Sequence, residues 1–213
     1  MPVYGGVAVG TAPTPRVTFQ TLVTNISRMA PSKRERTRER LAACALELFE
    51  RQGFERTTVA EIAAVAGVSE MTFFRHFPTK EAAVTTDPFD PVLAAAIALR
   101  PTHEPPLVRV ARAVRDATRS LPELAGESTR RRVRVVSSSP ALRAAATRAN
   151  EATETAIRDQ LVQDGTAPSD ASVAAAATLA ALTAALYDWA GADGQTLAGA
   201  LASALRVLGA DDD

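Results

Sequence analysis

The residues best suited to specific chemistry lie between Glu70 and Lys80, in the segment EMTFFRHFPTK. The hydroxyl and methyl groups of Thr72 fit against the base edges of DNA and against the methyl group of thymine. Arg75 can donate hydrogen bonds to guanine or to phosphate, and His76 and Lys80 suit backbone phosphates. Phosphate contacts fix the position of a helix on DNA, whereas base contacts select the sequence. The segment therefore predicts a helix that lies in a DNA groove.

Two short helices around a glycine turn are expected to position this segment. Thr58 and Glu61 have the spacing of a capping box, which begins a helix. Gly67 can adopt the left-handed conformation that ends the helix, and Ser69 can cap the next one. The first helix carries a narrow apolar stripe of Val59, Ile62, Ala63 and Ala66, and the second turns Phe73 and Phe77 inward. This pattern predicts a helix-turn-helix unit.

These residues resemble the DNA-binding region of the tetracycline-repressor (TetR) family of bacterial transcription regulators. The resemblance extends from Ser32 to Glu81 and rests on four motifs: Gly53-Phe54, Thr57 to Ala63, Ala66 to Ser69, and Thr72 to Glu81. It implies an all-α protein with two parts. One is an N-terminal three-helix helix-turn-helix DNA-binding domain, and the other is a C-terminal helical domain for ligand binding and dimerisation.

The resemblance also implies which residues contact DNA. In the family, DNA is contacted at the positions that match Thr58, Thr72, Phe74, His76 and Lys80. We expect further contacts from Lys33, Arg34, Glu70, Met71 and Arg75. This chain departs from the family pattern at two positions, since the family has a small residue in place of Met71 and a tyrosine in place of Phe74. The operator sequence therefore does not carry over from the family.

Composition places any attraction to DNA in one region. The 213 residues hold 24 Lys and Arg against 24 Asp and Glu, so the whole chain has no net pull toward nucleic acid. Between Ser32 and Lys80 there are nine basic and seven acidic residues, and a dimer would double this small excess. Several basic residues lie at the start of the first helix, where an arm can reach phosphates or the minor groove.

Several classes of function and location are disfavoured by the sequence. The chain has one cysteine and two histidines that lie far apart in sequence. These residues form neither a catalytic group nor a metal site, and we expect no cofactor. Cys44 is predicted to be a buried thiol on the apolar face of the first helix. We expect no run of residues to reach the ~20 apolar residues that cross a bilayer, and no signal peptide is evident. We therefore expect a cytoplasmic protein without catalytic activity that does not contact membranes.

The chain is predicted to divide into four segments. Residues 1–31 form a disordered leader, and Met29 is the expected start of the working protein; residues 32–80 form the DNA-binding domain. Residues 81–209 form the effector-binding and dimerisation domain, and residues 210–213 form an acidic tail. Helices are predicted at 107–120, 122–136, 140–163, 169–190 and 194–208. Near Pro88 we expect either a hinge in a connecting helix or a new helix with Pro91 in its first turn.

The last two predicted helices, 169–190 and 194–208, are expected to form a dimer interface. The helix from Ser169 is apolar around much of its circumference, and the last helix adds Leu197, Leu201, Leu205 and Leu208. Two copies of this pair can make a four-helix bundle across a two-fold axis. The alternative is that both helices complete the core of a monomer.

The effector site has a weaker signal in the sequence. The run Arg130-Arg131-Arg132-x-Arg134 can hold an anionic ligand or be solvated and paired with acids. Candidate ligand residues are Phe89, Arg130 and Arg134, whereas Tyr187 and Trp189 are expected to pack in the core or the dimer.

Two functions remain open at this stage. The first is a homodimeric regulator that represses from a palindromic operator of double-stranded DNA and is released by a small-molecule effector. The alternative is a helical scaffold or ligand-binding protein that keeps the helix-turn-helix only for packing.

Overall fold

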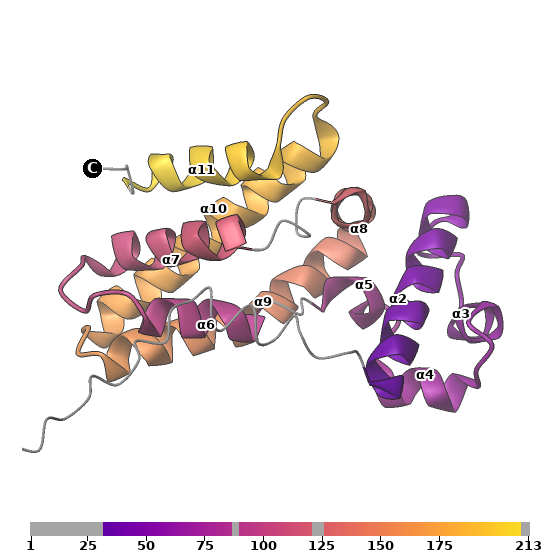
Figure 1. Cartoon of the computed structure of the whole chain (residues 1–213). Coiled ribbons are helices and arrows are strands. Elements are labelled where there is room, and N and C mark those ends of the chain that lie inside the picture. The colour runs from indigo at the N-terminus through magenta and orange to yellow at the C-terminus, as the bar shows by residue number, and fades with distance from the viewer. Residues whose placement is uncertain (1–31, 87–89, 121–125, 210–213) are drawn as a thin grey trace, which may run out of the picture.

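The computed structural model describes residues 32–86, 90–120 and 126–209, and every regular element within these ranges is a helix, as the sequence predicts (Figure 1). The helices are α2 (Lys33–Gln52), α3 (Val59–Val65), α4 (Glu70–His76), α5 (Ala82–Thr85), α6 (Asp90–Ala98), α7 (Pro106–Ser120), α8 (Glu127–Ser138), α9 (Pro140–Gln163), α10 (Pro168–Gly191) and α11 (Leu197–Val207). The leader, the acidic tail and the expected hinge at Pro88 lie outside the described residues.

Helices α2, α3 and α4 form a compact head at one end of the molecule (Figure 1). Helix α2 begins at a capping box in which Ser32 Oγ accepts from the backbone N–H of Glu35, and it ends at Gly53, whose φ is 85°. Its apolar face lies in one buried cluster with Ile62 of α3, Phe73 of α4 and Phe77 at the end of α4, and both rings are almost fully buried. Cys44 was predicted to be buried but is half-buried at the edge of this core, where burial raises the pKa of its thiol.

The remaining helices form a second layer of packing in which alanine is abundant. Helices α6, α7, α9, α10 and α11 share one apolar core, and α8, α10 and α11 share another around Trp189. The helices predicted at 107–120, 140–163 and 169–190 agree to within one residue, whereas α8 starts at Glu127, five residues after the predicted start, and residues 121–125 lie outside the described ranges. Helix α11 starts later than predicted because Thr196 caps it, its hydroxyl accepting from the N–H of Gly199 at 3.1 Å. Helix α6 begins at Asp90 and has Pro91 in its first turn, which matches the second of the two expectations for this region.

The head shares one buried cluster with α5, α8 and α9. Val135 and Val136 of α8 and Leu142 of α9 belong to the same buried cluster as the head residues. Helix α8, seen end-on in Figure 1, lies between the two parts. Its Arg131 forms an ion pair with Glu50 of α2, in which Arg131 Nε donates to Glu50 Oε1 at 2.9 Å. Helix α8 therefore contacts the head both through this ion pair and through the shared buried cluster.

Helix α10 corrects one expectation. It is long and apolar enough to cross a membrane by length and composition, although no such segment was expected from the sequence. Helix α10 contributes to both of the apolar cores described above. Even so, only 28% of its most apolar 18-residue stretch is buried. Val173 at its start is 67% exposed. Much of this helix therefore presents apolar surface that the single chain does not cover.

Candidate DNA-binding surface and ligand cavity

Helix α4 presents a mixed surface to solvent, as its spacing predicts. Ser69 caps the helix, accepting from the N–H of Thr72 at 3.2 Å, and the two hydroxyl groups lie 3.0 Å apart. Phe73 is fully buried, whereas Met71 is 73% exposed and Phe74 is 52% exposed. Two large apolar side chains held outward on a short helix are unusual for a surface that contacts only water. They suit contact with base edges and thymine methyl groups.

The turn before α4 has the predicted geometry. Thr58 and Glu61 form a reciprocal capping box at the start of α3, with Glu61 Oε2 accepting from the backbone N–H of Thr58 at 2.7 Å. The same carboxylate accepts from the Thr58 hydroxyl at 2.9 Å. These hydrogen bonds lower the pKa of Glu61. Gly67 has a φ of 67°, which side chains resist, so the sharp turn between the two helices depends on glycine.

Lys80 has a role inside the head that the sequence did not indicate. Its Nζ donates to the carbonyl oxygens of Phe54 and Thr57, both at 2.8 Å, and lies 3.9 Å from the centroid of the Phe54 ring. An ammonium group has three N–H donors, so this pairing leaves one for another partner. Lys80 therefore fastens the loop between α2 and α3, whatever it contributes to DNA binding.

Arg38 also has a structural role in the head that its sequence context does not indicate. Its guanidinium donates to the carbonyl of His76 at 2.6 Å and lies 4.3 Å from the centroid of the Phe77 ring. It thereby satisfies a carbonyl at the end of α4 and ties that helix to α2. Both contacts join residues far apart in sequence, so no local pattern announces them.

The basic start of α2 lies beside the end of α4. Lys33 and Arg34 are exposed there, and Arg75 and Glu70 are exposed on α4. The pKa of His76 is lowered, first by burial and then by the charges of Arg34, Arg38 and Arg75. The structure thus brings the predicted DNA-contacting residues of α2 and α4 onto neighbouring surfaces. His76 is only half-buried, and its Nδ1 has no hydrogen-bond partner among the described residues.

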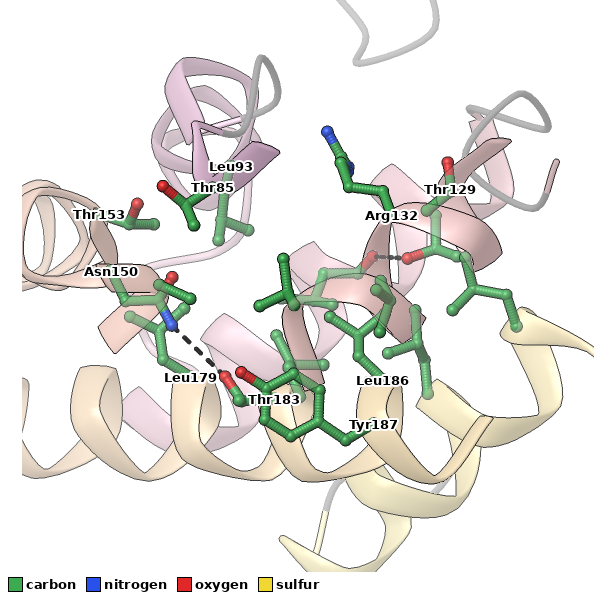
Figure 2. A pocket seen from close by; sticks show the side chains of 18 of the residues that line it. Thr85, Leu93, Thr129, Arg132, Asn150, Thr153, Leu179, Thr183, Leu186 and Tyr187 are labelled. Carbon is green, nitrogen blue, oxygen red and sulfur yellow. Dashed lines mark hydrogen bonds between the residues drawn. The ribbon is translucent and has the colours of Figure 1, made fainter. Parts of the chain in front are cut away.

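A cavity of about 250 Å³ lies between the rear helices (Figure 2). Its lining comes from α5 to α11, and most of it is apolar. The polar groups that line it include Thr85, Asn150, Thr153, Thr183 and Arg132. Asn150 donates to the Thr183 hydroxyl at 3.4 Å across the gap between α9 and α10. A concave, mostly apolar space with a few polar groups is the usual form of a small-molecule site.

Two of the predicted ligand residues, Arg130 and Arg134, lie outside the lining of this cavity. Arg130 does not line the cavity, because it lies 4.5 Å from the Trp189 ring centroid and donates to the carbonyls of Ala192 and Gln195. Arg134 is exposed and also lies outside the lining. Phe89 lies outside the described residues. From the arginine run, only Arg132 lines the cavity.

Two aromatic residues of α10 have different surroundings. Trp189 is buried, as expected, and its indole N–H donates to the carbonyl of Gln195 at 3.1 Å. Tyr187 packs against two buried clusters, as expected, and it also lines the cavity, where burial raises the pKa of its hydroxyl. Among the described residues, no group of three or more His, Cys, Asp or Glu side chains is arranged to hold a metal ion.

The comparisons with known proteins agree with this architecture. The family model described as "Bacterial regulatory proteins, tetR family" matches residues 41–84, which contain most of the head. A TetR C-terminal model, described as the MftR C-terminal domain, matches residues 104–212, more than half of the chain.

Individual relatives match shorter stretches. The chain is 45% identical over 85 residues to the HTH-type transcriptional regulator TcmR of Streptomyces glaucescens, covering 39% of this chain and 38% of TcmR. It is 47% identical over 49 residues to the nucleoid occlusion factor SlmA of Escherichia coli, covering 23% of this chain and 25% of SlmA. The chain therefore spans little more than a third of the length of TcmR and a quarter of SlmA.

A solved structure extends the similarity in fold to most of the molecule. The crystal structure of NalD from Pseudomonas aeruginosa superposes with a TM-score of 0.54 at 22% sequence identity, covering 83% of this chain and 96% of NalD. The head, the rear helices and both family models lead to the same assignment. The chain belongs to the TetR family of bacterial transcription regulators.

Proposed function

We propose that this chain is a ligand-responsive repressor that binds a palindromic operator through two α4 helices and releases it when a small molecule occupies the cavity. The observation that carries the proposal is the exposure of Met71 and Phe74 beside the buried Phe73. A helix kept only for packing has no reason to hold two large apolar side chains in water. Membership of the TetR family makes the chain a DNA-binding regulator rather than an enzyme.

The proposed DNA contacts fall into two groups. Met71, Thr72, Phe74 and Arg75 contact bases and set the preferred sequence. Residues that contact phosphates, or that orient the helix toward them, are Lys33, Arg34, Thr58, Glu70, His76 and Lys80. Position supports part of this division, because the whole first group lies on α4, whereas Lys33 and Arg34 lie on the neighbouring start of α2 and Thr58 caps α3.

A mobility-shift assay with the DNA upstream of the chain's own gene tests the proposal. The wild-type chain should give a specific band at moderate salt. Thr72→Ala should change the preference at one or two base pairs, whereas a phosphate-contact variant should weaken binding on all sequences alike. Absence of any specific band, or equal losses for Thr72→Ala on every operator, would favour the scaffold alternative.

The homodimer is proposed from the uncovered surface of α10 and α11. Small residues repeat along one exposed face of α10, at Ala176, Ala180 and Ala184, beside the exposed Val173. Val207 of α11 is 82% exposed. A stripe of small residues allows two helices to approach closely, and a two-fold pair would bury both copies of this face. The dimer would also set two α4 helices to reach successive major grooves, roughly 34 Å apart.

Sedimentation of the wild-type chain and of Ala180→Arg tests the dimer. The wild type should sediment as a dimer at micromolar concentration, and the substituted chain should sediment as a folded monomer with much weaker DNA binding. Ala152→Arg, an exposed change on α9, is a matched control that should remain dimeric. A monomeric wild type that binds lipid vesicles instead would overturn both the dimer and the proposed cytoplasmic location.

A further inference from the structure

The walls of the cavity contain one charged side chain. Among the described residues that line it, Arg132 carries the sole charge, and the surrounding surface includes Leu93, Leu179, Leu182 and Leu186. Figure 2 shows Arg132 on the same side as Thr129, across the cavity from Asn150 and Thr153. A guanidinium beside an apolar space favours an anion there, since its charge is not fully screened by water.

Arg132 differs from the other arginines of its run. Arg130 donates to two backbone carbonyls, Arg131 pairs with Glu50, and Arg134 Nε donates to the carbonyl of Ala190 at 3.4 Å. Arg132 forms no hydrogen bond or ion pair with any residue in the described ranges. Its donors, which match a carboxylate in geometry, therefore remain available to a ligand.

Thr153 supplies an independent indication. It is 4% exposed and lines the cavity, yet its hydroxyl has no hydrogen-bond partner among the described residues. Other helical threonines of the lining satisfy their hydroxyls within the helix: Thr85 donates to the carbonyl of Glu81 and Thr118 to that of Val114. A buried hydroxyl without a partner is costly, so its presence in a cavity wall indicates a polar ligand group.

We propose that the effector is a small organic acid whose carboxylate pairs with Arg132, whose apolar body fills the leucine-lined space, and whose second polar group reaches Thr153. This inference rests on the proposed function, because it names the chemical class of the ligand for the same cavity. The volume of about 250 Å³ lies just below the range of roughly 300–1,000 Å³ that is typical of small-molecule sites. A compact acid fits this space better than a long chain.

Matched pairs of acids and amides test the charge requirement. The probes are octanoate, phenylbutanoate and naphthaleneacetate, each paired with its primary amide, with octylamine as a cationic comparison. Calorimetry on the full-length chain should show at least one acid that binds about tenfold or more tightly than its amide, because a charge-assisted hydrogen bond is lost in the amide. Equal or tighter binding of the amides or of octylamine would overturn the proposal, as would failure of all three acids to bind at millimolar concentration.

Two variants of the same helix locate the effect. Arg132→Met should reduce the affinity for the acid to that for its amide, while binding of the amide persists and shows that the cavity is intact. Arg134→Met, which removes an exposed arginine outside the lining, should retain the preference for the acid. A preference for the acid that survives Arg132→Met, or that is lost equally in both variants, would contradict the assigned role.

The role of Thr153 has its own test. Hydroxyoctanoate with a terminal hydroxyl should bind more tightly than octanoate to the wild-type chain, and Thr153→Val should remove this difference while octanoate binding remains. Equal affinities of the two acids for the wild-type chain would contradict the second contact.

DNA binding distinguishes failure of the inference from failure of the proposed function. If neutral or cationic compounds release the chain from its operator and acids do not, the proposed regulatory function is supported and the proposed acid effector is wrong. If acids bind through Arg132 but the chain binds no specific DNA, the proposed ligand class is supported and the proposed repressor function is wrong.

Discussion

Three polar side chains of the head donate to backbone carbonyls, whereas two polar side chains of the cavity wall have no hydrogen-bond partner among the described residues. In the head, Lys80 donates to two carbonyls, Arg38 closes the end of α4, and the buried hydroxyl of Thr57 donates to the carbonyl of Gly53 at 2.9 Å. In the cavity, Arg132 and Thr153 have no such partners among the described residues. The hydrogen-bonded side chains of the head hold α4 in one orientation, which base-specific DNA contacts require. The side chains of the cavity wall that have no partner remain able to hydrogen-bond a ligand.

The largest difference should separate two neighbouring phenylalanines of the head. Phe73→Ala removes a fully buried ring and should destabilise the head by about 3–5 kcal/mol, abolishing DNA binding. Phe74→Ala removes a ring that is 52% exposed, so it should weaken DNA binding while the thermal melting curve changes little. Circular dichroism and a mobility-shift assay on both variants check this. Similar melting curves for the two would mean that α4 does not separate packing from recognition.

Lys80→Met keeps the apolar stem but removes the ammonium group. It should cost about 2–3 kcal/mol of stability, because hydrogen bonds from a charged group to two carbonyls are lost. The proposed phosphate contact predicts in addition that the slope of log affinity against log salt falls by about one. Urea denaturation measures the first effect and salt titration the second. An unchanged slope would remove the phosphate contact and leave Lys80 as a purely structural residue.

Two buried threonines sharpen the contrast between the regions. Thr57→Val should cost about 1–2 kcal/mol, because it leaves the carbonyl of Gly53 without this donor in a buried setting. Thr153→Val should be neutral or stabilising in the ligand-free chain, since it replaces a buried hydroxyl that has no partner with a methyl group. Urea denaturation of both variants gives the comparison. A loss of stability in both would show that Thr153 is satisfied in solution.

The smallest effect concerns pH and His76. Burial and the charges of Arg34, Arg38 and Arg75 lower the pKa of His76 below its ordinary value of 6.5, so the imidazole is neutral near pH 7 in the free chain. Because the folded state disfavours the protonated form, the stability present above pH 6.5 should decline as pH falls from there toward the lowered pKa. DNA phosphates should favour protonation, so DNA affinity should rise modestly between pH 8 and 6. Fluorescence anisotropy should show a flatter profile for His76→Gln, and identical profiles would exclude the contact.

Local patterns predicted most of the fold but little of the cavity. The capping box at Thr58 and the glycine at Gly67 mark helix ends within the segment itself, so these ends could be predicted and agree with the structure. The cavity lies between helices that are distant in sequence. Its position depends on where small side chains leave space between the packed helices. For the same reason the arginine run could be recognised, but sequence alone could not show that Arg132 lines the cavity while Arg130 stacks on Trp189.

The contacts that tie the head together were also beyond local prediction. Lys80 and Arg38 reach carbonyls 23 or more residues away, and the ion pair between Glu50 and Arg131 joins residues 81 apart. The hydrogen bonds from Arg131 lower the pKa of Glu50. Such pairings follow from the assembled fold and carry no periodic signal.

Selection of bound sequences from random double-stranded DNA by the wild-type chain tests the central claim most directly. The account predicts enrichment of a two-fold symmetric sequence whose half-sites are one helical turn or a multiple of it apart, and altered base preference within each half-site for Thr72→Ala. Enrichment of no motif, or of an asymmetric motif that Thr72→Ala selects equally well, would contradict a dimeric regulator that reads DNA through α4.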